Sequence, residues 1–260
     1  MKTMDNNDGY VQSHTEHGIT TIEFFHPKSN SLPGKILNSL AHEIHYAGTH
    51  DTKVIILRSG GIGAFCAGAS FDELMAIRNE KDGFEFFMGF ANVINAMRQC
   101  KKLIIGRIHG KCVGGGVGIA SAVDYAIGVD SVEVKLSELA IGIGPFVIGP
   151  AVERKIGTSA FSQLAIDATL WRNADWAKKK GLFAETHETV SNMDDSINRL
   201  ANTLTHSSPE AMAALKSVFW KGTENWDILL KERAAISGKL VLSDFTKNAI
   251  KAFNDKGKKE

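Results

Sequence analysis

The sequence predicts a mixed α/β fold, with parallel strands and helical crossovers in the first half and helices in the second. Up to about residue 157, short apolar runs alternate with segments in which apolar residues recur at helical spacing. Beyond that point the helical spacing dominates. Strands separated by helices are typical of a parallel sheet with both faces covered. One α/β core with an appended helical region is therefore expected.

Apolar segments predict the strands of this core. Residues 22–25 form the first, and residues 54–57 are a continuous apolar run that is typical of a strand buried on both faces. Residues 103–105 and 125–129 repeat that character. The crossover helix between the first two strands is indicated by four apolar residues at helical spacing, which are Leu37, Leu40, Ala41 and Ile44.

The second half contains recognisable helix signals. Apolar residues within 197–204 recur at i, i+3, i+4 and i+7, and a similar stripe opens at Trp226. Ser208-Pro209-Glu210 is typical of a helix start, since proline fits the first turn and a carboxylate favours the positive end of the helix dipole. No internal repeat or Pro-rich linker interrupts the chain, which disfavours two flexibly joined domains.

Charge and composition exclude several classes of partner. Thirty basic residues against 29 acidic ones give a formal charge of +1, which provides no field for binding nucleic acid or an anionic membrane. A small molecule or another copy of the chain is the expected partner. The polar start of the chain, and the lack of any run of about 18 apolar residues, predict neither secretion nor membrane insertion.

Cysteine usage points to a reducing compartment. Cys66, Cys100 and Cys112 cannot all pair, and they show no CxxC or Cys/His spacing. Reduced thiols, a cytoplasmic location and no metal site are therefore expected.

Two stretches of small residues each follow a predicted strand and precede a predicted helix. They are Phe65-Cys66-Ala67-Gly68-Ala69-Ser70 and Gly114-Gly115-Gly116-Val117-Gly118. The N–H groups that begin a helix lack partners within it, so they can hold developing negative charge on a ligand. Tight packing of strand against helix explains either stretch equally well when it is taken alone. Neither stretch forms a Walker A loop or a GxGxxG motif.

Together with other ordered motifs, these stretches resemble the enoyl-CoA hydratase/isomerase (crotonase) family. The resemblance implies a crotonase-like ββα spiral core with an acyl-CoA site over residues 1–200, and a C-terminal helical oligomerisation region over residues 201–260 that forms a homotrimer or a homohexamer. It implies no cofactor beyond the coenzyme A moiety of the substrate. The matching segments are 65–69 with 71–74, Gly110 to Asp124, Asn30-Ser31-Leu32, Gly181-Leu182, Ser208-Pro209 and Ala252-Phe253.

The resemblance also assigns roles by position. The N–H groups of Ala69 and Gly115 would form the oxyanion hole for the thioester oxygen, each worth on the order of 3 kcal/mol in the enolate-like transition state. Basic side chains near the mouth would pair with the coenzyme A phosphates, and Phe253 would help to close a neighbouring site. Substrate contacts would come from Cys66, Ala67, Gly68, Gly114, Gly118 and Phe146.

One departure from the family is the most informative feature of the sequence. Hydratases of the family carry two glutamates; the later one matches Glu138, whereas Gly118 stands at the place of the earlier one. Hydration uses an acid and a base around one water, but moving a double bond needs only one group that shuttles a proton. Gly118 with Glu138 thus favours an isomerase. The surrounding motifs also resemble a bacterial branch that hydrates branched, methylglutaconyl-like enoyl-CoA. An enoyl-CoA hydratase-type enzyme is therefore the first prediction, and an isomerase with one Glu as proton shuttle is the alternative. A binder without catalysis, or an RNA-binding relative, is a third hypothesis.

An apolar wall is expected to raise the pKa of Glu138 toward neutrality, supplied by Ile141, Ile143, Phe146 and Val147. Other candidates have plainer interpretations. Asp72 and Glu73 could replace the missing glutamate, but their place in a first helical turn favours a dipole role. Asp124 is expected to be structural, His109 to be a satisfied packing residue, and Ser70 to cap the following helix.

Overall fold

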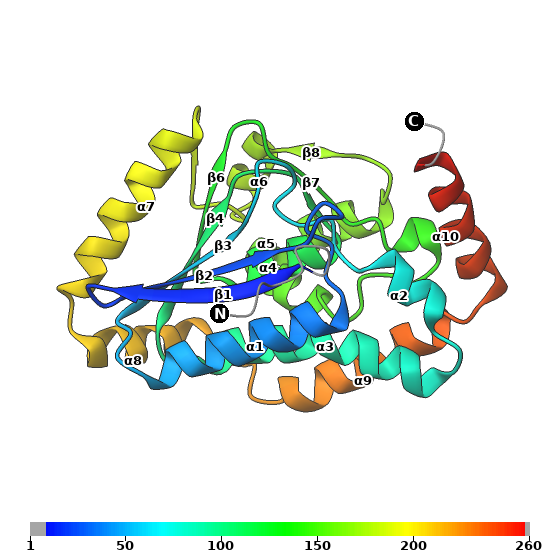
Figure 1. Cartoon of the computed structure of the whole chain (residues 1–260), viewed down its shortest axis with the longest axis horizontal. Coiled ribbons are helices and arrows are strands. Elements are labelled where there is room, and N and C mark those ends of the chain that lie inside the picture. The colour runs from blue at the N-terminus through cyan, green and yellow to red at the C-terminus, as the bar shows by residue number, and fades with distance from the viewer. Residues whose placement is uncertain (1–8, 258–260) are drawn as a thin grey trace, which may run out of the picture.

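The computed structural model describes residues 9–257, which form two sheets and the helices that cover them (Figure 1). The larger sheet has six strands in the order β1-β2-β3-β4-β6-β9. The first two strands pair antiparallel, and every later pair is parallel. Its strands are β1 (Tyr10–Glu16), β2 (Ile19–Phe25), β3 (Val54–Ser59), β4 (Leu103–Ile108), β6 (Tyr125–Val129) and β9 (Glu185–His187).

A smaller sheet of three strands carries segments that form the candidate site. It consists of β5 (Cys112–Val113), β7 (Glu133–Lys135) and β8 (Arg172–Asn173), with β7 in the centre. β5 and β7 run parallel, so the segments that follow both strands leave the sheet at the same edge.

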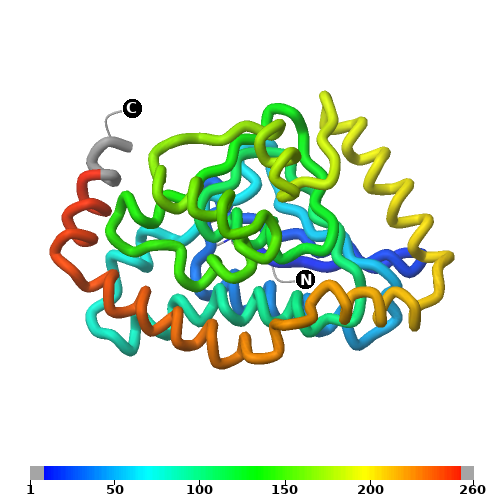
Figure 2. The backbone as a smooth tube through the Cα atoms, turned by 180° about the vertical axis from the view of Figure 1, so that it is seen from behind, coloured from blue at the N-terminus to red at the C-terminus, as the bar shows by residue number. Residues whose placement is uncertain are grey.

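The helices form layers around the larger sheet (Figures 1 and 2). α7 contacts β2, β3, β4, β6 and β9, whereas α1 packs on β1 and β2 and also against α3. The helices are α1 (Gly34–Thr49), α2 (Phe71–Ala76), α3 (Glu80–Gln99), α4 (Gly115–Ala122), the 3-10 turn η1 (Leu139–Ile141), α5 (Gly149–Ile166), α6 (Ala174–Lys179), α7 (Val190–Thr205), α8 (Pro209–Phe219), α9 (Trp226–Leu240) and α10 (Asp244–Gly257).

The predicted strands and helices are confirmed, with longer bounds than the apolar runs alone gave. Residues 22–25, 54–57 and 103–105 lie within β2, β3 and β4, and 125–129 is β6. Ser208 caps α8, because its Oγ accepts a hydrogen bond from the N–H of Ala211 at 3.2 Å. The sequence missed β1, an edge strand whose side chains are mostly exposed and therefore show no apolar alternation.

The C-terminal helices pack within their own chain. α9 lies along α3, and the two backbones approach so closely that a Cβ atom on Gly83 would lie 2.6 Å from the carbonyl oxygen of Gly238. The predicted stripe on α9 faces inward, since Trp226, Leu230 and Ala234 are buried. α10 contacts α2 and η1 and so reaches the region of the site.

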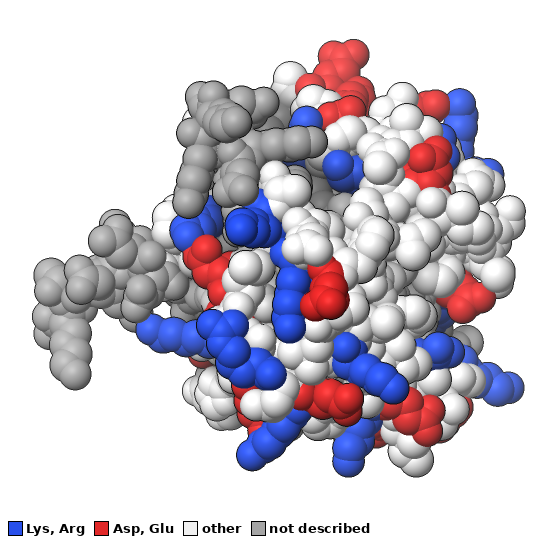
Figure 3. All heavy atoms as spheres, turned by 90° about the vertical axis from the view of Figure 1, so that its right-hand side faces the viewer, with Lys and Arg blue, Asp and Glu red and all other residues white. Residues whose placement is uncertain are grey.

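The surface carries charges of both signs. Figure 3 looks at the side on which α2 and α10 lie, and it shows basic and acidic side chains interspersed around a hollow in the upper part of this face. Among the helices within residues 9–257, none is long and apolar enough to cross a membrane.

Candidate active site

The two small-residue stretches lie side by side. Cys66 and Cys112 form an isolated parallel bridge, in which the N–H of Val113 donates to the carbonyl of Cys66 at 2.9 Å. A second bridge joins Leu32 to Ala69. The first bridge brings the segment 66–69 against the segment 112–115, and the second joins it to Leu32. Neither of the two small-residue stretches is part of the larger sheet.

Each stretch presents a backbone donor at the position that the resemblance assigned to the oxyanion hole. The bridge to Leu32 uses the carbonyl of Gly68 at 2.8 Å and the N–H of Ser70 at 3.4 Å, so the N–H of Ala69 points to the opposite edge. Gly115 begins α4, where an N–H has no partner within the helix. In the described part of the chain, neither donor meets a backbone acceptor. Both residues line one cavity.

Glu138 lies against the loop that carries the Gly115 donor. Its backbone carbonyl accepts from the N–H groups of Ile141 at 3.2 Å and Ile143 at 3.0 Å, which fixes the turn η1 after β7. Gly114 has φ +51°, a conformation that favours glycine, and a Cβ atom there would lie 2.8 Å from Glu138 Oε1. The carboxylate therefore packs against the loop that carries the Gly115 donor.

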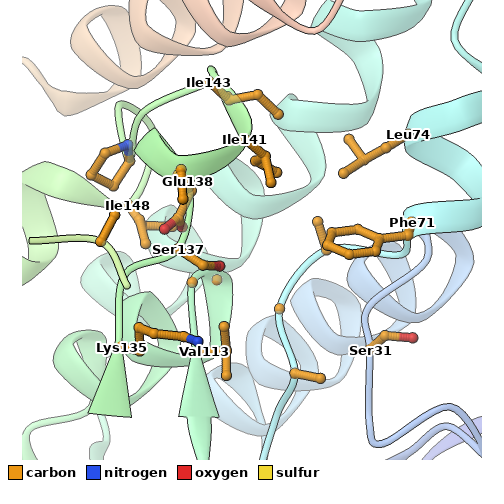
Figure 4. A pocket seen from close by; sticks show the side chains of 18 of the residues that line it. Ser31, Phe71, Leu74, Val113, Lys135, Ser137, Glu138, Ile141, Ile143 and Ile148 are labelled. Atoms are coloured by element: carbon orange, nitrogen blue, oxygen red, sulfur yellow. The ribbon is translucent and has the colours of Figure 1, made fainter. Parts of the chain in front are cut away.

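The surroundings of Glu138 favour its neutral form. Burial raises the pKa of Glu138 from 4.5 to about 7, against the opposing effect of a hydrogen bond from its own backbone. Its Oε2 atom is buried without a hydrogen-bond partner in the described structure. Ile141, Ile143 and Ile148 surround it in Figure 4. The predicted rise in pKa is confirmed.

A side chain at position 118 has no room. A Cβ atom on Gly118 would lie 2.6 Å from both Cβ and Cγ2 of Ile148, which follows the turn of Glu138 and begins α5. Such a distance is far below van der Waals contact, so Ile148 fills the volume that a second glutamate would occupy. Among the described residues, two carboxylates line the cavity: Glu138 is half-buried with its Oε2 atom enclosed, and Asp72 is exposed.

The cavity beside these groups measures about 860 Å³, within the range that holds small-molecule ligands. Apolar side chains dominate one end, from Phe71 and Leu74 on α2 to Ile141 and Ile143 (Figure 4). α9 and α10 of the same chain close it through Ser237, Ala249 and Ala252. Its polar side chains are Lys28, Ser29, Ser31, Ser70, Asp72, Lys135, Ser137, Glu138, Thr169, Trp171 and Ser237.

Most of the residues that the sequence singled out meet at this cavity. Its walls include Ala67, Gly68, Ala69, Gly114, Gly115, Glu138 and Phe146. Cys66 and Gly118 do not: Cys66 is fully buried beneath its segment and Gly118 lies under Ile148. On this geometry both residues support the wall without touching its contents. The side chain of Phe253 lies outside the described residues.

The acids near the first stretch serve other purposes. Asp72 forms an ion pair with Lys28 at the rim, and Glu73 accepts from the N–H of Gly34 at 2.8 Å at the start of α1. Ser70 caps α2 through a 3.5 Å hydrogen bond from the N–H of Glu73, as predicted. Neither acid lies beside Glu138 as a second buried carboxylate.

Asp124 is structural, as expected. It is held by Lys216 Nζ at 2.9 Å, Trp220 Nε1 at 3.2 Å and the N–H of Ile104 at 2.8 Å. His109 is buried as expected for a packing residue, but neither ring nitrogen has a partner among the described residues. Burial lowers its pKa, with a smaller contribution from Arg107, and it does not line the cavity.

Sequence reasoning missed several residues of the cavity wall. Ile148, Trp171 and Ser237 come from segments without a motif, and only the fold brings them to the cavity. Lys135 and Ser137 precede Glu138 within one short segment, so their proximity to it was a usable signal.

Comparisons with curated proteins reveal relatives of varied activity. The chain is 27% identical over 207 residues to carnitinyl-CoA dehydratase of Citrobacter koseri, covering 79% of this chain and 78% of that protein. It is 26% identical over 189 residues to the peroxisomal Delta(3,5)-Delta(2,4)-dienoyl-CoA isomerase of Arabidopsis thaliana, covering 67% of this chain and 66% of the isomerase. Identity at this level does not select one reaction.

Solved structures share the whole fold. An enoyl-CoA hydratase from Bacillus halodurans superposes with a TM-score of 0.86 at 19% identity, covering 94% of this chain and 99% of that chain. An enoyl-CoA hydratase from Mycobacterium avium gives a TM-score of 0.83 at 23% identity, covering 95% and 96%. The family model described as enoyl-CoA hydratase/isomerase matches residues 14–260. The chain therefore belongs to the enoyl-CoA hydratase/isomerase family.

Proposed function

We propose that this protein is an enoyl-CoA isomerase that moves the double bond of an enoyl-CoA thioester, with Glu138 as its single acid/base group. The filled volume over Gly118 carries this proposal, because among the described residues it leaves Glu138 as the one carboxylate of the cavity with an enclosed oxygen. A reaction that needs one proton shuttle fits this arrangement better than one that needs two carboxylates.

The two backbone donors supply the electrostatic part of the reaction. The thioester oxygen binds at the N–H groups of Ala69 and Gly115, which are fixed before the substrate arrives. As a proton leaves C2, negative charge moves onto that oxygen, and each donor contributes on the order of 3 kcal/mol to the transition state.

Glu138 moves the proton. Its carboxylate takes a proton from C2 of a 3-enoyl thioester, forming a dienolate whose charge rests on the thioester oxygen. The resulting carboxylic acid returns the proton to C4, which leaves a 2-enoyl thioester and regenerates the carboxylate. A pKa of about 7 suits both halves, since the group is neither a weak base nor a weak acid near neutral pH.

Hydration is the second candidate, and Ser137 favours it. Figure 4 shows the Ser137 hydroxyl and the Glu138 carboxylate directed into the same part of the cavity. A hydroxyl beside the carboxylate could orient a water for addition to C3, in place of the glutamate that Gly118 lacks. A branched, methylglutaconyl-like enoyl-CoA belongs to this second candidate.

Doubly labelled water separates the candidates. A 3-enoyl-CoA, a trans-2-enoyl-CoA and its 3-methyl analogue are incubated with the protein in water containing deuterium and heavy oxygen, and the products are weighed by mass spectrometry. Deuterium without heavy oxygen is expected for an isomerase. Heavy oxygen in the product would replace isomerisation by hydration. A shifted double bond without any label would mean that Glu138 returns the same proton, and substrate that is neither converted nor labelled would leave a binding protein without this chemistry.

A further inference from the structure

One wall of the cavity carries a cation without a matching anion. Lys135, the last residue of β7, lines the cavity, and its Nζ lies 4.2 Å from the centre of the Trp171 ring. Of the carboxylates in residues 9–257, none forms an ion pair with it. Figure 4 shows its ammonium end beside Val113, at the opposite end of the view from Ile141 and Ile143.

A second lysine approaches the same ring. Lys111 Nζ lies 4.7 Å from the centre of Trp171 and 3.0 Å from Glu133 Oε2. Its charge is therefore matched by Glu133, whereas that of Lys135 is not. Burial, and secondly the charge of Lys111, lower the pKa of Lys135. An anion in the cavity would relieve both effects, and the indole fixes where the ammonium points.

The position of Lys135 relative to the donors fits a ligand that spans both. Lys135 pairs with Val113 in the small sheet, and its carbonyl accepts from the N–H of Gly114 at 2.9 Å. Gly115 follows Val113 by two residues, about 7 Å of extended chain. A thioester held at Gly115 can therefore place another of its groups at Lys135.

We propose that Lys135, held on Trp171 and backed by Lys111, is a subsite for an anionic oxygen group of the ligand. Two parts of an acyl-CoA present this chemistry, a carboxylate on the acyl group and the phosphates of coenzyme A. Either forms charge-assisted hydrogen bonds with a lysine ammonium. The subsite rests on the proposed function in so far as the ligand is an acyl-CoA thioester.

Four unreactive thioesters separate the two sources. Butyryl-CoA carries phosphates, glutaryl-pantetheine carries a carboxylate, glutaryl-CoA carries both, and butyryl-pantetheine carries neither. Dissociation constants are measured by calorimetry for the wild type, Lys135→Met and Lys135→Arg. The matched control is Lys179→Met, which removes an exposed lysine that pairs with Asp175 on α6. Thermal melting verifies that each variant is folded.

Lys135→Met is expected to weaken binding about 10- to 100-fold for the ligands that carry the recognised anion. Losses confined to the two CoA thioesters identify the phosphates, and losses confined to the two glutaryl thioesters identify the acyl carboxylate. Lys135→Arg should keep most of the affinity, and Lys179→Met all of it. Equal losses for all four ligands, or none, overturn the subsite.

Proton exchange at C2 is measured separately on the same samples. Wild-type exchange together with unchanged binding in Lys135→Met overturns the subsite and leaves the proposed function standing. Suppose instead that Lys135→Met weakens binding of the anionic ligands selectively, but the wild type neither exchanges a proton at C2 nor moves the double bond. The subsite then stands, and the proposed function alone is removed.

Discussion

Two carboxylates with enclosed oxygens lie near the two ends of α4, and their surroundings are opposite. Asp124, just beyond the end of α4, has three partners: Lys216, Trp220 and the backbone of Ile104. Glu138, beside the start of α4, packs against Gly114 and leaves one oxygen without a hydrogen-bond partner in the described structure. A satisfied carboxylate stabilises the fold, whereas an unsatisfied one retains the capacity to exchange a proton.

Removing the proton shuttle should have the largest effect on activity. Glu138→Gln keeps the shape of the side chain but cannot take up a proton, so kcat for double-bond migration should fall about 10²- to 10⁴-fold. Stopped assays of 3-enoyl-CoA conversion measure it, with the exposed Glu188→Gln as the control. Turnover within about threefold of the wild type would remove Glu138 from the mechanism.

Removing the cation that pairs with Asp124 should lower the stability of the fold and leave the activity unchanged. Lys216→Ala removes an almost fully buried ion pair, in which Nζ lies 2.9 Å from Asp124 Oδ2. Leaving that charge without its cation should lower the free energy of unfolding by about 3–5 kcal/mol, while activity per folded molecule is retained. Urea denaturation measures it against Lys231→Ala, an exposed residue of α9. A loss below about 1 kcal/mol would contradict the assigned role.

The carboxyl group of Glu138 should make the free energy of unfolding decrease as pH rises. Burial raises the pKa of Glu138 from 4.5 to about 7, so between these values the folded chain keeps a proton that the unfolded chain has released. Its contribution to the free energy of unfolding therefore decreases as pH rises through this window, by about 3 kcal/mol in total, and is constant above it.

Glu138→Gln removes this dependence. The free energy of unfolding of the variant minus that of the wild type should grow between pH 4.5 and 7 and then stay level. Urea titrations at several pH values measure the difference. A difference that does not change with pH would show that Glu138 titrates normally.

The volume over Gly118 gives the smallest expected effect. Gly118→Ala places a methyl group where Ile148 already lies, and overpacking of this kind lowers the free energy of unfolding by about 1–3 kcal/mol. In the double variant with Ile148→Ala, the two effects should not add, because the second change vacates the space. Additive effects would mean that the two positions do not share one volume.

The sequence predicted the parts of the molecule that depend on local pattern. Apolar runs located β3, β4 and β6, and the two small-residue stretches marked the segments that line the cavity. The choice of Ala69 and Gly115 as donors within them came from the resemblance to the crotonase family. The raised pKa of Glu138 followed from its apolar neighbours in the chain.

Contacts between distant segments were beyond such reasoning. Ile148 over Gly118 and Trp171 beside Lys135 depend on how α5 and β8 are placed, which no periodicity reports. The edge strand β1 was not predicted, because its side chains are mostly exposed and therefore show no apolar alternation. Tertiary packing thus decided both the filled volume over Gly118 and the surroundings of Lys135 in the proposed subsite.

The contact between Gly118 and Ile148 makes the order of sequence changes matter. A mutation that introduces a glutamate at position 118 first meets a filled volume and destabilises the protein before any new chemistry can be tested. A mutation that shrinks Ile148 first opens the volume in which that glutamate would then fit. Laboratory evolution toward a two-carboxylate enzyme is therefore expected to succeed only when Ile148 is made smaller before a glutamate is introduced at position 118. Libraries that vary position 118 alone will not contain this order of changes.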